Sequence, residues 1–343
     1  MSATLSTFLR PVFRLSADAF PRLAAQRFGA QEDMDRTWRT FEPVARTLVD
    51  SFYLAIDNRR QDQLAAKLDA VDPELRGIAY EGAGMGVTLL DSLLPGSTRL
   101  PSFLAGPGAP YRCLVLIGAG LVLPRVPRRP ERFLARQDPL LRWFVMDGYG
   151  FYEGFFSWRR TIEAHGVPRR LHGYARQAFD QGVGRSLWFS TGANVDRIIS
   201  TINRFEPSRQ PDLWSGIGVA CAYAAGVMDR VAVSRLFEAA GRHRAHVAVG
   251  TAIASVFRAE SGHAAPHTDL ACEVVWRRDS LQVAAVAEET RLGLDTGPDA
   301  PPLYAQWRRR IEDRWLAGSQ PSPDASSSTR RETPTPTYGG TDR

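Results

Sequence analysis

A pair of glycines separated by one residue recurs along the chain at a nearly constant interval. Successive pairs begin 34, 30, 34, 34 and 34 residues apart, at Gly84, Gly118, Gly148, Gly182, Gly216 and Gly250, although the last start lacks its second glycine. In four consecutive units an aromatic residue follows the first glycine by seven positions, as Phe155, Phe189, Tyr223 and Phe257. This period is typical of stacked helical hairpins, which bury their apolar faces only against neighbours. The recurrence therefore predicts an all-α fold.

Each unit is interpreted as a first helix that opens on the glycine pair, a turn, and a second helix. A turn at Gly192 and a second helix over 231–240 fit this interpretation. The unit resembles a divergent tetratricopeptide hairpin, with Tyr223 in the aromatic position and Ala220 in the small position. The sequence thus favours a TPR-like α-solenoid of repeats of about 34 residues. A closed α-toroid of the same hairpins is the alternative.

Composition along the chain suggests four segments. Residues 1–45 are expected to form an N-terminal helical lead-in, and residues 46–295 the α-helical repeat domain. An arginine-rich terminal helix is expected over 300–317. From 319 to 343 the chain is rich in Ser, Thr, Pro and Gly with almost no apolar residues, so this tail is expected to be disordered.

Charge and composition exclude several classes of function. The net charge is +6, but the arginines are dispersed without a recognisable motif, so nucleic acid is not expected as a partner. The three cysteines lack paired spacing, which indicates buried thiols in a reducing compartment. No stretch approaches the ~20 consecutive apolar residues of a spanning helix. We expect a cytoplasmic protein, with membrane contact by an amphipathic N-terminal arm as the lesser alternative.

The candidate catalytic residues lie in one segment, residues 147–156, which is rich in aromatic residues. Asp147 and Glu153 are six positions apart, so on a continuous helix they point in directions roughly 120° apart. A carboxylate buried among aromatic rings has a raised pKa and can act as a general acid. The alternative for Asp147 is a helix cap, because an acidic residue before a helix start accepts hydrogen bonds from free N–H groups.

The candidate binding residues lie near the starts of the units and comprise Glu81, Tyr149, Arg185, Trp188 and Trp214. Recurring polar residues such as Glu81 and Gln181 suit a lined groove or a hydrogen-bond ladder between units. Arginine with tryptophan suits a carboxylate or a phosphopantetheine group. Packing between helices is the alternative for the tryptophans.

No cofactor or metal is expected. The His243-x-x-His246 spacing suits a helix face, but no nearby carboxylate or cysteine completes a ligand set. His263 and His267 lie beside Pro266 in an expected loop, where histidines are usually solvated. The G-x-G pairs lack the third glycine and the preceding strand of a dinucleotide site.

Several segments, taken together and in order, resemble a bacterial family associated with enediyne antibiotic biosynthesis. The resemblance covers about 40–295 and is carried by residues 80–86 (YEGAGMG), 147–156 (DGYGFYEGFF), 180–189 (DQGVGRSLWF), 212–216 (DLWSG) and 266–268 (PHT). The arginine-rich composition also fits an actinobacterial source.

The resemblance implies a role beside a linear polyene made on a carrier protein. One hypothesis is an accessory protein that binds a polyene or polyketide intermediate, or its acyl carrier protein, in an aromatic- and arginine-lined groove. A second is a cofactor-independent cyclase or isomerase with Asp147 or Glu153 as the acid. A third is a scaffold for other biosynthetic proteins. Convergence of the carboxylates and Arg185 in a closed pocket would favour the enzyme over the groove.

Overall fold

The computed structural model describes residues 15–28, 32–58, 60–94, 96–126, 129–224 and 229–319, excepting the side chains of residues 32–34. This described part of the chain contains helices and no strand, which confirms the predicted all-α fold. The elements follow in the order α2 (Ala19–Phe28), α3 (Glu32–Asp57), α4 (Gln61–Asp69), α5 (Pro73–Leu93), α6 (Arg99–Ala105), η1 (Ala109–Tyr111), α7 (Arg112–Val122), η2 (Leu123–Arg125), α8 (Pro130–Leu134), α9 (Trp143–Phe156), η3 (Arg159–Glu163), α10 (Tyr174–Ser190), α11 (Val195–Ile202), α12 (Gln210–Tyr223), α13 (Arg230–Ala239), η4 (Gly241–His243), α14 (Arg244–Glu260), α15 (Pro266–Trp276), α16 (Ser280–Glu289) and α17 (Leu303–Ser319).

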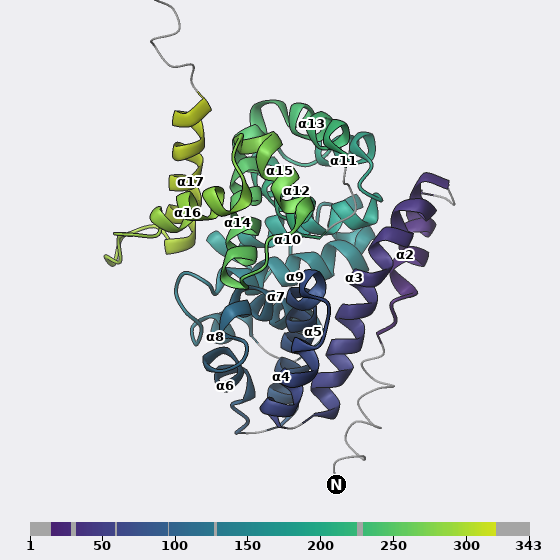
Figure 1. The fold of residues 1–343 in the computed structure, drawn as a ribbon, viewed down its shortest axis with the longest axis vertical. Coiled ribbons are helices and arrows are strands. Elements are labelled where there is room, and N and C mark those ends of the chain that lie inside the picture. Colours follow the sequence, from purple (N-terminus) through teal and green to yellow (C-terminus); the bar gives the residue numbers. More distant parts are fainter. Residues whose placement is uncertain are drawn as a thin grey trace, which may run out of the picture.

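A row of helices packs in the order of the sequence. α3 packs on α5, α5 on α7, α7 on α9, α9 on α10, α10 on α12, and α12 on α14. In Figure 1 the colours accordingly run from blue at one end of the molecule to green at the other, with the long α3 along one side. Packing of each element on the next in sequence is the arrangement of an α-solenoid. We call α5, α7, α9, α10, α12 and α14 the glycine helices.

The recurring glycines lie inside these helices and not at their starts. α10 begins at Tyr174, well before Gly182. A Cβ atom at Gly182 would lie 1.8 Å from the carbonyl oxygen of Asp147 in α9. One at Gly184 would lie 2.1 Å from the carbonyl oxygen of Leu213 in α12. The pair therefore lets α10 approach both neighbouring backbones, and the prediction that each helix opens on its glycines is wrong.

The structure also changes the register of the first unit. In α5 a Cβ atom at Gly82 would lie 2.2 Å from the Leu48 carbonyl oxygen in α3. One at Gly84 would lie 2.4 Å from the Val115 carbonyl oxygen in α7. The first glycine of a pair thus faces the preceding helix and the second faces the following one. Gly82 with Gly84 is therefore the equivalent pair, in place of Gly84 with Gly86.

Shorter helices accompany the later glycine helices. α13 packs on both α11 and α15, in the order of the sequence. Gly192, in the turn before α11, has a φ of 64°, a left-handed conformation that glycine adopts without steric cost. α13 covers nearly the whole range predicted for a second helix. These helices form a second row beside the glycine helices.

The row of glycine helices curves back on itself. Arg258 of α14, the last glycine helix, donates from Nη1 to the carbonyl oxygen of Glu74 in α5, at 2.9 Å. Its Nη2 donates to the carbonyl oxygen of Tyr223 in α12, also at 2.9 Å. His267 of α15 is buried beside them, with Nδ1 3.1 Å from the Glu74 carboxylate, so the expectation of a solvated histidine is wrong.

The first and last described helices, α2 and α17, lie on the outside of this row. The boundary predicted at residue 45 falls inside α3, a continuous helix from Glu32 to Asp57. α17 covers the range predicted for a terminal helix and runs on to Ser319. In Figure 1, α17 and α3 stand on opposite sides of the molecule. Residues 1–14 of the lead-in and 320–343 of the tail lie outside the described residues.

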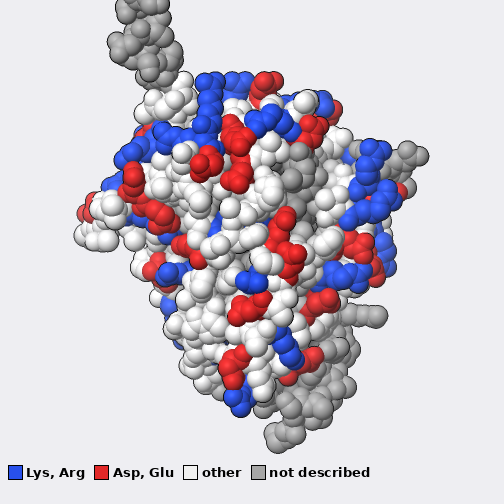
Figure 2. Space-filling model, viewed as in Figure 1, with Lys and Arg blue, Asp and Glu red and all other residues white. Residues whose placement is uncertain are grey.

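Within the described ranges, no single helix is both long enough and apolar enough to cross a membrane. A pair of segments, Arg99–Ala105 and Ala109–Arg125, reaches that length and hydropathy only across a bend of 95°. On the face shown in Figure 2, acidic and basic side chains are interspersed. The cytoplasmic location stays a prediction.

Candidate functional site

The residue before the first glycine of a pair faces its equivalents on neighbouring glycine helices. Gln181 of α10 donates from Nε2 to Oδ2 of Asp147 in α9, at 2.7 Å. Ser215 of α12 lies 3.5 Å from the Gln181 amide oxygen, and the Tyr304 hydroxyl of α17 donates to the same oxygen at 3.1 Å. These buried polar groups therefore form a hydrogen-bond ladder between units, one of the two arrangements considered from the sequence.

Arg185 lies one turn after Gln181 and connects this ladder to the first unit. Its Nε is 2.6 Å from Asp147 Oδ1, and its Nη2 is 4.0 Å from Glu81 Oε1. The guanidinium carbon is 5.1 Å from the centre of the Phe151 ring. Only 7 % of Arg185, 6 % of Glu81 and 1 % of Asp147 is exposed. One buried cation thus faces two buried carboxylates.

The unequal distances determine which carboxylate holds a proton. Burial raises the pKa of Glu81, Arg185 offsets part of this effect, and nearby Asp147 adds to it, with a net pKa of about 7. Burial also raises the pKa of Asp147, but Arg185 and the Gln181 amide lower it. Asp147 has the close ion pair and the hydrogen bond, so it is the better stabilised anion. Glu81 is therefore the group that exchanges a proton near neutral pH.

A small cavity opens beside Glu81 and Arg185, and we call it the inner cavity. Its volume is about 40 Å³, room for a few water molecules. Aromatic and apolar side chains from α2, α3 and the glycine helices line it, among them Phe20, Trp38, Phe41, Phe151, Phe189 and Tyr223. Arg185 Nη2 is buried and has no hydrogen-bond partner. The inner cavity therefore places an unsatisfied donor and a titrating acid beside an apolar space.

Two other residues predicted on α9 lie apart from this cluster. Glu153 is buried and pairs with Arg160. The Tyr149 hydroxyl accepts a hydrogen bond from Arg170, and its ring centre lies 6.0 Å from that of Phe179. Neither residue lines the inner cavity. The structure thus unites Glu81, Asp147 and Arg185 and separates Glu153 and Tyr149 from them.

The predicted tryptophans are part of the core. Trp188 in α10 and Trp214 in α12 are 1 % and 2 % exposed. Neither lines the inner cavity. The helix-cap interpretation of Asp147 is wrong, because α9 begins at Trp143 and Asp147 lies within it.

The sequence analysis missed the residues that α2 and α3 contribute to the cavity. Phe20, Trp38 and Phe41 come from the region interpreted as a lead-in, where no motif separates a cavity wall from ordinary core packing. It also missed Tyr304, which reaches Gln181 from the terminal helix, 123 residues away. Such long-range contacts leave no local signal. Phe151 was inside the quoted aromatic segment, but its cation–π contact with Arg185 depends on the packing of α9 on α10.

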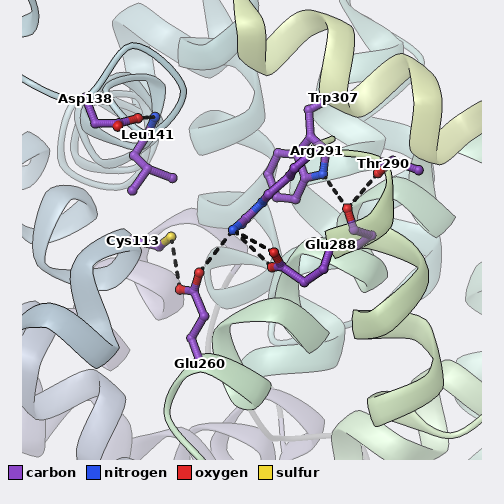
Figure 3. Close-up of polar contacts among 9 residues, drawn as sticks. Cys113, Asp138, Leu141, Glu260, Glu288, Thr290, Arg291 and Trp307 are labelled. Carbon is purple, nitrogen blue, oxygen red and sulfur yellow. Dashed lines mark hydrogen bonds and ion pairs between the residues drawn. The ribbon is translucent and has the colours of Figure 1, made fainter. Parts of the chain in front are cut away.

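A second polar cluster, partly exposed and shown in Figure 3, joins α7, α14 and the end of α16. Cys113 Sγ lies 3.7 Å from Glu260, and Arg291 lies 3.1 Å from the same carboxylate. Arg291 also pairs with Glu288 and stacks over the ring of Trp307. Burial and the neighbouring Glu260 raise the pKa of Cys113 well above its ordinary value. The thiol is thus protonated at neutral pH, which argues against a nucleophile.

No group of three or more histidine, cysteine, aspartate or glutamate residues in the described ranges is arranged to hold a metal ion. His243 and His246 have ring centres 5.7 Å apart, and Glu312 Oε1 lies 3.8 Å from His246 Nε2, but these three residues are not arranged as a ligand set.

Comparison with known proteins assigns the chain to a family. A family described as "Protein of unknown function (DUF1702)" matches residues 10–315. The chain belongs to this family. The match includes every glycine helix and all three residues of the Glu81, Arg185 and Asp147 cluster. No curated protein and no solved structure matches the chain.

Asp147→Asn is expected to lower the pKa of Glu81 by about one unit. The change removes a like charge and leaves Arg185 with Glu81 as its only anionic partner in the cluster. The pKa is measured by ¹³C NMR titration of glutamate-labelled protein. Asp196→Asn, which removes an exposed carboxylate paired with Arg235, is the control and leaves the titration of Glu81 unchanged. An unchanged pKa in Asp147→Asn would show that the two carboxylates are not coupled.

Proposed function

We propose that the protein binds an unsaturated apolar chain with a carbonyl group beside Glu81, and transfers a proton on that chain as a cofactor-independent isomerase or cyclase. The observation that carries the proposal is the inner cavity: a titrating carboxylate and an unsatisfied guanidinium donor in an aromatic wall. Groups with perturbed pKa values in an apolar pocket are typical of acid–base catalysis.

Each polar residue has a separate role in this proposal. The Glu81 carboxylate takes a proton from a carbon conjugated with the carbonyl group, and Arg185 Nη2 donates a hydrogen bond to the developing enolate oxygen. Glu81 then returns the proton to a different carbon of the same conjugated system, so the double bond moves. Proton and electron pair are both conserved, and no redox partner is needed. Asp147 is a positioning residue that holds Arg185.

The pathway part of the proposal rests on the sequence resemblance. A linear polyene or polyketide intermediate of enediyne biosynthesis is apolar, unsaturated and carries a carbonyl group, which matches the chemistry of an aromatic lining with one oxyanion donor. The raised pKa of Glu81 is matched to work near neutral pH, where a group must both accept and return a proton. In this proposal Glu81 replaces Asp147 and Glu153 as the acid–base residue.

Binding without chemistry is the second candidate, because an aromatic lining that opens around a reactive polyene shelters it without any proton transfer, whether the polyene is free or on its carrier protein. The lining of Phe151, Phe189 and Tyr223 favours it. A scaffold for pathway enzymes is the third possibility, and the row of helices offers the surface for it. Substitution of Glu81 distinguishes proton transfer from binding without chemistry, since only proton transfer requires the carboxylate.

The test is a Glu81→Gln replacement in the organism that carries the gene, compared with wild type and a deletion. We expect the pathway product to fall by about 100-fold or more, as in the deletion, with normal protein abundance. Glu238→Gln, the same change on an exposed face of α13, keeps the product. Product loss in the deletion alone would refute proton transfer and support binding. Normal product in the deletion would refute the pathway assignment.

A further inference from the structure

Three hollows adjoin one another along α2. The mouth hollow, of about 390 Å³, lies between α2, η2 and the end of α9. A middle cavity of about 30 Å³ shares Leu15, Arg125, Tyr152 and Phe156 with it. The middle cavity in turn shares Phe20, Leu48 and Phe151 with the inner cavity. The hollows thus follow one another from the surface to Glu81 and Arg185.

The chemical character of the lining changes along this path. The mouth hollow is lined by two exposed arginines, Arg22 on α2 and Arg125 in η2, and no acidic side chain is among its described lining residues. The middle cavity is apolar except for Arg125 and the Tyr152 hydroxyl. The inner cavity ends in Glu81 and Arg185. A positive mouth before an apolar interior suits a chain with an anionic end.

Phe20 occupies the junction of the middle and inner cavities. Its ring centre lies 5.0 Å from Phe155 and 5.4 Å from Phe156, both at the end of α9. It is 4 % exposed and belongs to the lining of both cavities. An extended chain therefore reaches Glu81 only if this ring moves aside.

α2 is a short helix with hydrogen bonds to the rest of the protein near both of its ends. Before it, the Leu15 amide donates to the Tyr53 hydroxyl at 2.9 Å, and that hydroxyl donates back to the Leu15 carbonyl oxygen. Near its C-terminal end, Arg27 donates to Ser190 Oγ at 3.0 Å. This ten-residue helix packs less extensively on α3 and α10 than neighbouring glycine helices pack on each other, so displacement of Phe20 costs less than opening the glycine helices.

We propose that the three hollows form one channel for a linear apolar chain, whose anionic end binds Arg22 and Arg125 at the mouth while a carbonyl group nearer its far end reaches Glu81 past a displaced Phe20. This inference rests on the proposed function and adds the direction of entry and the class of ligand. The shared chemistry is an anionic group at the end of an apolar chain. A free carboxylic acid and an acyl-phosphopantetheine arm both carry it.

The mouth is tested with cis-parinaric acid, a conjugated tetraene carboxylic acid whose fluorescence rises on binding. We expect Arg22→Ala/Arg125→Ala to weaken binding by about tenfold, the loss expected of charge-assisted contacts, and to leave binding of the methyl ester unchanged. Arg136→Ala/Arg235→Ala, which removes two arginines outside the channel, keeps wild-type binding. Equal binding of the acid by wild type and the mouth variant would overturn the proposal.

The junction is tested with Phe20→Ala, which removes the ring between the two cavities. We expect about fivefold tighter binding of cis-parinaric acid, because the chain no longer has to displace the ring. Phe20→Leu keeps an apolar plug and gives an intermediate affinity. Circular dichroism checks that both variants are folded. Binding weakened in proportion to the volume removed would show that Phe20 is a fixed wall, which contradicts the channel.

Competition distinguishes the two sources of the anionic end. Dodecanoate and dodecanoyl-phosphopantetheine each displace cis-parinaric acid if the mouth accepts any anion, and the stronger competitor identifies the source. Displacement by neither would overturn the proposal. A different observation would refute the proposed function, namely retained pathway product in Glu81→Gln. The binding assay does not measure pathway product, so the two failures can be distinguished.

Discussion

Gly182→Ala is expected to lower the free energy of unfolding by about 3 kcal/mol or more. The new Cβ atom would lie 1.8 Å from the Asp147 carbonyl oxygen and 2.8 Å from the Phe151 amide nitrogen, both in the backbone of α9. A backbone contact cannot be relieved by rotating a side chain, so α10 has to move away from α9. Overpacking of a core commonly costs about 1–3 kcal/mol, and this contact belongs at the upper end. Chemical denaturation of the purified protein measures the loss.

The matched control is Gly318→Ala. Gly318 lies in α17, and a Cβ atom there meets nothing within 4 Å. Alanine has the higher helix propensity, so this variant is expected to be as stable as wild type or slightly more stable. Equal stability of Gly182→Ala and wild type would contradict the close approach of the glycine helices. If Gly182→Ala fails to accumulate as folded protein while Gly318→Ala does, the expectation is met.

Glu81→Gln is expected to raise the free energy of unfolding at pH 8 by about 3 kcal/mol relative to wild type. Burial raises the pKa of Glu81 from an ordinary 4.5 to about 7. Between these values the folded state keeps a proton that the unfolded state has lost, so wild-type stability falls as the pH rises. Above pH 7 the stabilisation that the bound proton gave to the folded state is gone. The pKa difference of about 2.5 between the folded and unfolded states corresponds to about 3 kcal/mol. Glutamine has no such proton to lose.

Denaturation at a series of pH values from 4 to 8 measures this difference. The curves of wild type and Glu81→Gln are expected to meet near pH 4 and to separate as the pH rises. Glu238→Gln, at an exposed position, should run parallel to wild type throughout. A Glu81→Gln curve parallel to wild type would mean that Glu81 titrates as an ordinary carboxyl group.

The stability lost through Glu81 is itself an argument for function. A buried glutamine would make similar contacts without the cost that ionisation imposes above pH 7. A destabilising group kept in an apolar wall, beside the unsatisfied Arg185 Nη2, is characteristic of active sites, where activity and stability compete. In the second cluster, Arg291 pairs with both Glu260 and Glu288 and stacks on Trp307, and within the described residues no cavity opens beside it, so it binds elements together.

The helical architecture could be predicted from the glycine spacing, but the position of the glycines within the helices could not. The repeat period gives the number of residues between equivalent glycines, and it does not show where along each helix those glycines lie. Glycine is a poor helix former, so a helix start was the natural assumption for Gly182. Contact between two backbones outweighs that propensity, and it is a tertiary interaction. The same difficulty shifted the first unit, since residues 82–86 contain three alternating glycines.

The candidate site could be predicted only in part, because the sequence identifies single residues and not their tertiary contacts. Glu81, Asp147 and Arg185 are polar residues at unusual positions in apolar helices, and the sequence identifies them individually. Their convergence depends on the curvature of the row, which lets the Arg185 side chain of α10 reach Glu81 of α5. Glu153 had the same local signal as Asp147 but points elsewhere, toward Arg160. The wall that α2 and α3 contribute, including Phe20, follows from packing alone.

The most direct test of the account is the protonation of Glu81 in the folded protein. ¹³C NMR of glutamate-labelled protein across pH 4 to 9 resolves the carboxyl resonances, and Glu81→Gln identifies the one that belongs to Glu81. The account predicts a resonance that titrates near pH 7 and is absent from the variant. A Glu81 resonance that titrates near pH 4.5 would contradict the account, because a carboxyl group ionised throughout the neutral range is no longer poised to accept and return a proton.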